Sequence, residues 1–349
     1  MSKTTDRWLS TLSTDGQQSM LALHDAFWRR ENCRILIGYA PINRLFPLQN
    51  LHIEHEGRFV PKDITESLMQ SDMVYRQPIV SGDDLFPAKI PLEALPWSEG
   101  YTGANVYLSS RAKAVWSDHA HSKPCNVTEL KNRVDPGWRK KLIQATTITV
   151  EAMADERLVS ESLFRGPADC IEAVMGAEAL CYALYDWPDE LSLMAEFMAD
   201  RVIELYQAQF EVLGTFHGGT INRYRLWGPG QNIVTQADIA NVMSPEHFKL
   251  VFVPSYRRLM QSFDTVTIHF HSSAVQHVDV LLEIDELDAI EWALDPIGPT
   301  LEQMVEVFVK IQRAGKCVII MNLNTDEQVR LLEDRLDVGG LCLIIRKEF

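Results

Sequence analysis

A regular alternation of strand-like and helix-like segments begins near residue 157 and runs through the rest of the chain. Short apolar runs such as IVTQADIA, TVTIHFHSS and CVIIMNLN are separated by longer segments whose apolar residues recur three and four positions apart. The first pattern is typical of buried strands and the second of amphipathic helices. Strands that alternate with helices form parallel βαβ units, which wind into an open sheet or close into a (β/α)8 barrel. We therefore predict an α/β fold, a (β/α)8 TIM barrel with an irregular N-terminal region.

The predicted barrel needs two strands from the N-terminal part of the chain. We count six strands after residue 157, whereas eight close a barrel of this type. The segment CRILIGYA, Cys33–Ala40, is a good candidate for one of the missing strands, and ANVYLSS is a candidate for the other. Residues 42–135 are otherwise irregular and rich in Pro, Asp and Glu, and we interpret them as inserted loops and short helices. Residues 1–349 are expected to form a single domain.

Composition and charge exclude several classes of protein. The chain is 46% hydrophobic and 23% charged, as in an ordinary globular protein, and its net charge of −15 opposes general binding to nucleic acid. It has no secretory signal core and no apolar run of about 18 residues, so no membrane span and a cytoplasmic location are expected. Six scattered cysteines without CxxC spacing indicate neither a disulfide framework nor a zinc ribbon. Neither glycine-rich motif that commonly cradles nucleotide phosphates occurs.

The strand TVTIHFHSS carries the most informative pair of side chains. Successive residues of a strand point to opposite faces, so Val266, Ile268 and Phe270 form an apolar face. His269 and His271 then share the polar face and would stand at the mouth of the barrel, where catalytic residues gather. Two imidazoles on one face can ligate a metal if a third ligand comes from elsewhere. They can equally form a hydrogen-bond network without a metal, and the sequence leaves both readings open.

Other predicted strand ends supply polar and aromatic candidates for the same mouth. Asp and Asn at such positions also serve as helix N-caps, and a tryptophan there can simply pack under a loop. His217 lies in the probable strand TFHGGTI, and the glycines that follow it would let a ligand approach the backbone. A second His-x-His pair, His119 and His121, falls in the irregular region. The strand-end candidates are Asp169, Gln236, Asp238, Glu291, Trp292 and Asn322.

The order of several loose motifs resembles the uroporphyrinogen decarboxylase superfamily, which includes the corrinoid-linked methyltransferases. The motifs are RGPADC, GAEALCYALYDWPDEL, MSPEHFKLVFVPSYRRL, TIHFHSS, LDAIEW and AGK, within Arg157 to Gly340. The chain is most similar to the uncharacterised decarboxylase-like branch. The resemblance implies a (β/α)8 barrel, in agreement with the strand count.

The resemblance also implies a zinc site in the methyltransferase branch, built from His-x-Cys and a cysteine of the last strand. His269 matches the first ligand, His271 stands where the cysteine would be, and Cys342 is the candidate for the third. The decarboxylases carry an arginine-rich motif near the N-terminus, where this chain has LIGYAPINRLF instead. A porphyrin substrate is therefore not indicated.

These observations favour an enzyme of methyltransferase type that acts on a small methylated or carboxylated substrate at the barrel mouth. His269 and His271 would be metal ligands or acid–base groups, with Glu291 and Asp238 orienting them or the substrate. The resemblance implies zinc as cofactor and a corrinoid protein as methyl donor. The alternatives are a decarboxylase acting on a non-porphyrin carboxylate and a non-catalytic barrel that binds a small molecule or a partner protein. The resemblance implies a further helix after GGLCLII. Either that helix is missing, which would leave part of the barrel exposed or covered by a partner subunit, or the strand count is wrong by one; an exposed apolar patch there would favour a homodimer.

Overall fold

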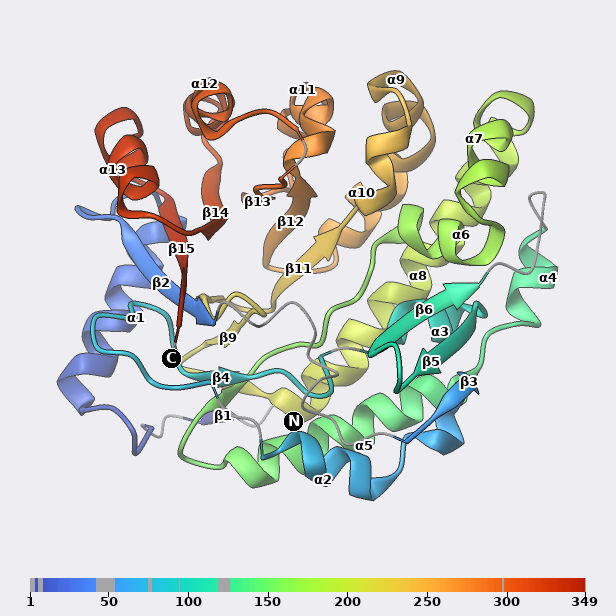
Figure 1. Ribbon diagram of the computed structural model, residues 1–349, viewed down its shortest axis with the longest axis horizontal. Coiled ribbons are helices and arrows are strands. Elements are labelled where there is room, and N and C mark those ends of the chain that lie inside the picture. The colour runs from blue at the N-terminus through green and yellow to red at the C-terminus, as the bar shows by residue number, and fades with distance from the viewer. Residues whose placement is uncertain are drawn as a thin grey trace.

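The computed structural model describes residues 4–5, 9–41, 54–74, 77–93, 95–118, 126–296 and 298–348. Six parallel strands form its central sheet, in the order β11-β12-β13-β14-β15-β2 (Figure 1). Their bounds are Asn232–Gln236 for β11, Thr265–His271 for β12, Ala289–Ala293 for β13, Cys317–Leu323 for β14, Leu341–Lys347 for β15 and Leu36–Pro41 for β2. The prediction of a parallel α/β fold is confirmed.

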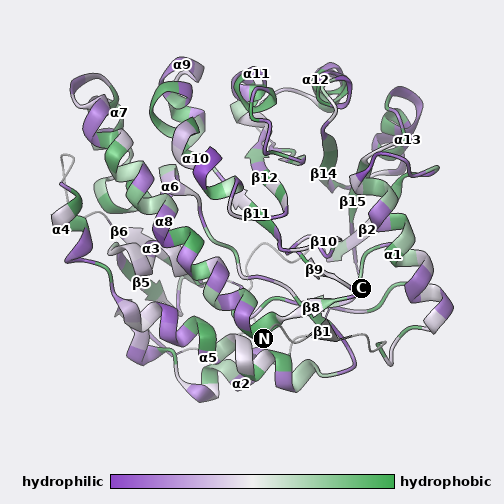
Figure 2. Ribbon diagram, turned by 180° about the vertical axis from the view of Figure 1, so that it is seen from behind, coloured by the Kyte–Doolittle hydropathy of each residue, from purple (hydrophilic) through white to green (hydrophobic). Residues whose placement is uncertain are grey.

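Helices cover one face of this sheet and follow the strands in sequence order. Figure 1 shows α7, α9, α11, α12 and α13 side by side along the upper rim of the molecule. Hydrophilic and hydrophobic segments alternate along α5 and α8 in Figure 2, because each helix has a buried and an exposed side. The bounds are Thr14–Trp28 for α1, Glu66–Asp72 for α2, Trp97–Thr102 for α3, Val127–Lys131 for α4, Pro136–Met153 for α5, Pro167–Met175 for α6, Ala177–Asp186 for α7, Pro188–Leu213 for α8, Pro245–His247 for α9, Val253–Met260 for α10, Val278–Leu282 for α11, Leu301–Arg313 for α12 and Asp326–Arg335 for α13.

Local signals explain where these helices begin and end. Thr300 caps α12 through its hydroxyl, and Gln303 completes a capping box. Gly176, with φ of 82°, separates α6 from α7. Pro254 lies in the first turn of α10, directly after a π-helical turn at Phe248–Phe252, because a proline cannot continue the hydrogen bonding of the helix before it.

The two faces of the sheet differ as the alternation in β12 predicts. Val266, Ile268 and Phe270 belong to the large core that includes residues of the covering helices. The opposite face joins a second core, which contains Cys342 and residues of the neighbouring strands at the same register. The polar face of β12 therefore lies on the inner side of the sheet.

The six-stranded sheet is not closed by hydrogen bonds among the described strands. The predicted barrel strand ANVYLSS forms β5, Asn105–Ser109, which pairs antiparallel with β3, Glu56–Arg58, and β6, Ala114–Asp118. That prediction is wrong, because the short connection from β5 to β6 produces a hairpin. Two short parallel strands, β4 at Ala88–Lys89 and β7 at Leu158–Val159, form a separate pair.

The segment TFHGGTI forms a hairpin, so its prediction as a single strand is also wrong. His217 and Gly218 have φ of 48° and 78°, and they form the turn between the two short strands. Its strands are β8, Thr215–Phe216, and β9, Gly219–Ile221, in a small sheet with β1, Thr4–Thr5, and β10, Trp227–Pro229.

The last strand, β15, is flanked on both sides. Strand β2 pairs with it in parallel from Cys342 opposite Leu36 onward, so β15 is not an edge. The apolar residues of this strand from Leu341 to Ile344 are buried, so no exposed apolar patch lies on that part of it. The large apolar side chains that are most exposed in the described part lie on other elements, among them Tyr185 on α7 and Leu193 on α8. No helix in the described ranges is long and apolar enough to cross a bilayer.

His24 connects α1 to the rest of the structure and gives a pH-dependent contribution to stability. Its Nε2 donates to the Asp84 carbonyl at 2.7 Å, and its Nδ1 accepts from the Trp227 N–H at 2.9 Å. Burial lowers the pKa of His24 from 6.5 to about 4. The folded state therefore binds fewer protons than the unfolded state between these values, and the stabilisation is complete above pH 6.5 and lost as the pH falls towards 4.

We expect the free energy of unfolding to lose about 3 kcal/mol through His24 as the pH falls from 7 to 4. The measurement is urea unfolding of the wild type and the His24→Asn variant across this range. The variant starts less stable at pH 7, and the gap between the two proteins should narrow on acidification. A constant gap would show that His24 is not held neutral.

Candidate functional site

The two histidines of β12 turn the same ring nitrogen towards one point. Nε2 of His269 lies 3.3 Å from Nε2 of His271. Oδ1 of Asp238, which begins the short 3-10 helix Asp238–Val242 after β11, lies 3.7 Å from each of them. Among the described residues these three are the group of His, Cys, Asp and Glu side chains whose ligand atoms converge closely enough to hold a metal ion. We call them the His–His–Asp cluster.

The other nitrogen of each histidine contacts a carboxylate. Nδ1 of His269 contacts Glu291, which stands opposite it on the neighbouring strand β13 and is fully buried. Nδ1 of His271 lies 2.8 Å from Oδ1 of Asp295, two residues beyond β13. Metal-binding histidines commonly donate their second N–H to a carboxylate, which fixes the tautomer and the ring orientation. The two carboxylates therefore orient both Nε2 lone pairs towards the shared point.

This arrangement is electrostatically incomplete without a positive charge. If both Nδ1 atoms donate to carboxylates, two neutral imidazoles point lone pairs at each other and at the Asp238 carboxylate. Burial lowers the pKa of His269, but the carboxylates of Glu291 and Asp238 outweigh burial and raise it above its usual value. The cluster is thus built to hold a cation, either a metal ion or a proton on one histidine.

The ligand spacing fits a metal ion. Ligand atoms about 2.0–2.1 Å from a tetrahedral zinc lie roughly 3.4 Å apart, close to the separation of the two Nε2 atoms. Oδ1 of Asp238 is buried and has no hydrogen-bond partner among the described residues, while Gln236 donates to Oδ2 at 2.8 Å. An unpaired buried carboxylate oxygen beside two imidazole lone pairs is a suitable third ligand.

Tyr224 extends the cluster into the interior, and no sequence pattern indicated it. Its hydroxyl donates to Oε2 of Glu291 at 2.7 Å and lies 3.2 Å from Nδ1 of His269. It comes from the turn-rich connection between β9 and β10, and no motif distinguishes it from the neighbouring polar residues. Glu291 is thereby held from two sides, by Tyr224 and by His269.

Two more predicted residues lie beside the cluster. Gln236 ends β11 opposite His269 and binds Asp238. Asp169, in the first turn of α6, accepts a hydrogen bond from the Ile239 N–H at 2.9 Å. Burial, with the nearby Asp238, raises the pKa of Asp169 to about 7. Asp169 thus supports the segment that carries Asp238, and its carboxyl is partly protonated near neutral pH.

Trp292 and Cys342 lie away from the cluster, for different reasons. Trp292 follows the inward Glu291 and therefore points to the opposite face, where it is fully buried with its ring 5.9 Å from that of Phe270. Cys342 is on the inner face but three strands from His269, roughly 14 Å along the sheet. Burial also raises the pKa of its thiol. Neither the predicted substrate contact of Trp292 nor the predicted ligation by Cys342 agrees with these positions.

His217 and Asn322 are also separate from the cluster. The turn that holds His217 lies beside the start of β11, since the Gly230 N–H donates to the Gly218 carbonyl at 3.0 Å. This is the amino end of the strand, opposite the end that carries Asp238. Asn322 lies near the carboxyl end of β14, at an irregularity with φ of 67°, two strands from β12. His119 and His121 fall outside the described residues.

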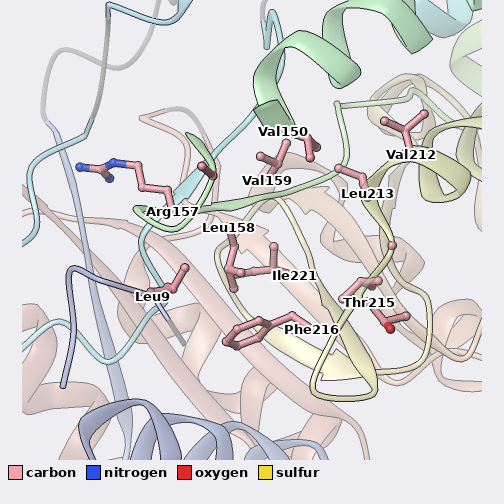
Figure 3. A pocket seen from close by; sticks show the side chains of 13 residues that line it. Leu9, Val150, Arg157, Leu158, Val159, Val212, Leu213, Thr215, Phe216 and Ile221 are labelled. Carbon is pink, nitrogen blue, oxygen red and sulfur yellow. The ribbon is translucent and has the colours of Figure 1, made fainter. Parts of the chain in front are cut away.

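A cavity of about 310 Å³ (Figure 3) lies next to the turn of His217, since the preceding residues Thr215 and Phe216 line it. Leu158, Phe216 and Ile221 line it, together with the carboxyl ends of α5 and α8. It contains none of the cluster residues. The cavity is therefore distinct from the candidate site.

Comparison with known proteins supports the fold. No family model matches the sequence, and no curated protein matches it. The structure is similar to that of a methyltransferase from Methanosarcina mazei, with a TM-score of 0.59 and 11% sequence identity over 98% of this chain and 94% of the other. At this identity the similarity shows a shared fold.

The position of Trp292 gives a testable distinction between a packing role and a substrate contact. We expect Trp292→Phe to lower the free energy of unfolding by about 1–3 kcal/mol, because it leaves a cavity in the core. No hydrogen bond is lost among the described residues, since the indole N–H has no partner there. Metal binding, measured by calorimetry, should be unchanged. A loss of metal binding in a stably folded variant would place Trp292 in the site after all.

Proposed function

We propose that the chain is a metal-dependent enzyme of methyltransferase type, acting on a small substrate at the carboxyl end of the sheet. The observation that carries this proposal is the convergence of His269, His271 and Asp238, each oriented by a further polar side chain. The likeness to a methyltransferase supports the fold on which such a site would be built. The carboxyl ends of parallel strands are also where barrels and open α/β sheets bind their substrates.

In this proposal the His–His–Asp cluster holds zinc, and a fourth position remains for the substrate. Bound zinc would favour the anionic, nucleophilic form of a coordinated heteroatom such as a thiol. Glu291 and Asp295 keep both histidines in the tautomer that leaves Nε2 free to ligate. Tyr224 fixes Glu291 through its hydrogen bond. Asp238 would be the third ligand, the role for which the family resemblance suggested Cys342.

The remaining parts of the proposal rest on the family resemblance and on the strand pattern. A corrinoid protein would deliver or accept the methyl group, and a homodimer in the cytoplasm is expected. The β4–β7 pair would occupy the two barrel positions between β2 and β11. Two hydrogen bonds support this placement: the Asp84 N–H donates to the Ile37 carbonyl at 2.9 Å, and the Gly166 N–H donates to the Gln236 carbonyl at 3.2 Å.

A second candidate is a metal-free decarboxylase. The distance of 3.3 Å between the two Nε2 atoms also fits a hydrogen bond from a protonated His269 to His271. A protonated imidazole could donate the proton that replaces carbon dioxide on the substrate carbon. In this case the same cluster would work as an acid without a metal.

Metal content separates the two candidates. We expect protein purified without a His-tag and loaded with zinc to retain about one zinc per chain, measured by elemental analysis after gel filtration. His271→Ala and Asp238→Asn should each reduce zinc affinity by at least tenfold. Cys342→Ala is the matched control and should keep the metal. Wild-type protein that retains no zinc, or a zinc that is lost only in Cys342→Ala, would contradict the proposed site.

A further inference from the structure

Arg165 lies on the same side of the chain as the candidate site. In the extended segment before α6, the side chains of Ser162 and Phe164 face α8: the Ser162 hydroxyl oxygen accepts a hydrogen bond from Gln209, and the Phe164 ring contacts that of Tyr206. Alternation then turns Arg165 to the opposite, inner face. The next residue, Gly166, donates its N–H to the carbonyl of Gln236, two positions before Asp238. The arginine therefore stands beside the mouth that holds the His–His–Asp cluster.

Buried groups hold the base of this side chain in place. The Arg165 N–H donates to the Ser98 hydroxyl oxygen at 2.9 Å, and Nε lies 3.1 Å from Oε1 of Glu99. The Ser98 hydroxyl in turn donates to the other Glu99 oxygen at 2.9 Å. Ser98 and Glu99 are 0% and 3% exposed, whereas the Arg165 side chain is 38% exposed. The guanidinium is thus anchored from behind and open towards solvent.

The guanidinium has unused hydrogen-bonding capacity. It offers five N–H donors, and within the described part of the chain Glu99 is its ion-pair partner. A planar guanidinium matches the two oxygens of a carboxylate, and the paired hydrogen bonds make this contact strong and directional. An anchored arginine with open donors beside a cation site can bind one end of a substrate while the other end reaches the cation.

We propose that the substrate is a small carboxylic acid whose carboxylate binds Arg165 and whose reactive group lies at the His–His–Asp cluster. This inference rests on the proposed function, because it assigns the substrate class of the same site. Neighbouring acids do not cancel the attraction. Glu99 lies behind the guanidinium, Asp238 faces the cation in the cluster, and Asp169 accepts a hydrogen bond from the Ile239 N–H. Glu172 is the other acid near Arg165, and it lies on α6.

Calorimetry with matched acids and amides tests the proposal. The probes are acetate, succinate and glutarate, each compared with its uncharged amide, on zinc-loaded and on metal-free protein. At least one acid should bind more tightly than its amide, and Arg165→Gln should weaken that acid about 10- to 100-fold without affecting the amide. Arg165→Lys keeps the charge and the pairing with Glu99, so it should fold normally and bind the acid with intermediate affinity.

Arg258→Gln is the matched control, since Arg258 pairs with Asp200 on the surface and should not affect any probe. Equal binding of acids and amides, or an acid preference that survives Arg165→Gln, would overturn the inference. Zinc content is measured on the same samples. Loss of zinc from wild type would count against the proposed metal site alone, because the acid preference is also read on metal-free protein.

Discussion

The rest of the site depends on two imidazole nitrogens, the Nε2 atoms of His269 and His271, which lie 3.3 Å apart. The other nitrogen of each ring contacts a carboxylate. The two Nε2 lone pairs and the Asp238 carboxylate repel one another unless a positive charge lies between them. Holding such an arrangement in a partly buried position has a free-energy cost that packing does not relieve. The simplest way to satisfy all three ligand atoms at once is a metal ion at their common point.

The parallel sheet produces this convergence with few residues. Adjacent parallel strands place their carboxyl ends at one edge, so Gln236, His269 and Glu291 stand side by side in register. The alternation along β12 then adds His271 to the same face, and the turn after β11 returns Asp238 towards it. Each contact within the cluster is between neighbouring strands or within two residues of a strand end.

Sequence reasoning identified the parts of the site that follow from periodicity. The inward face of β12 and the carboxylate Glu291 come from alternation and from polar strand ends; the face carries the two histidines of the cluster, and Glu291 contacts one of them. The same alternation separates Trp292 from Glu291. Local sequence does not show how many strands separate two residues in the sheet. Cys342 was therefore predicted on the correct face but lies too far from His269 to share a metal ion with it. Tyr224 and Arg165 come from irregular segments, whose placement depends on tertiary contacts that no local pattern predicts.

The most direct test is a crystal structure of zinc-loaded protein with anomalous diffraction data at the zinc edge. The account predicts one strong anomalous peak, about 2.0–2.2 Å from Nε2 of His269, Nε2 of His271 and an oxygen of Asp238. An absence of any peak at this point in fully loaded crystals, with a hydrogen bond joining the two imidazoles instead, would contradict it.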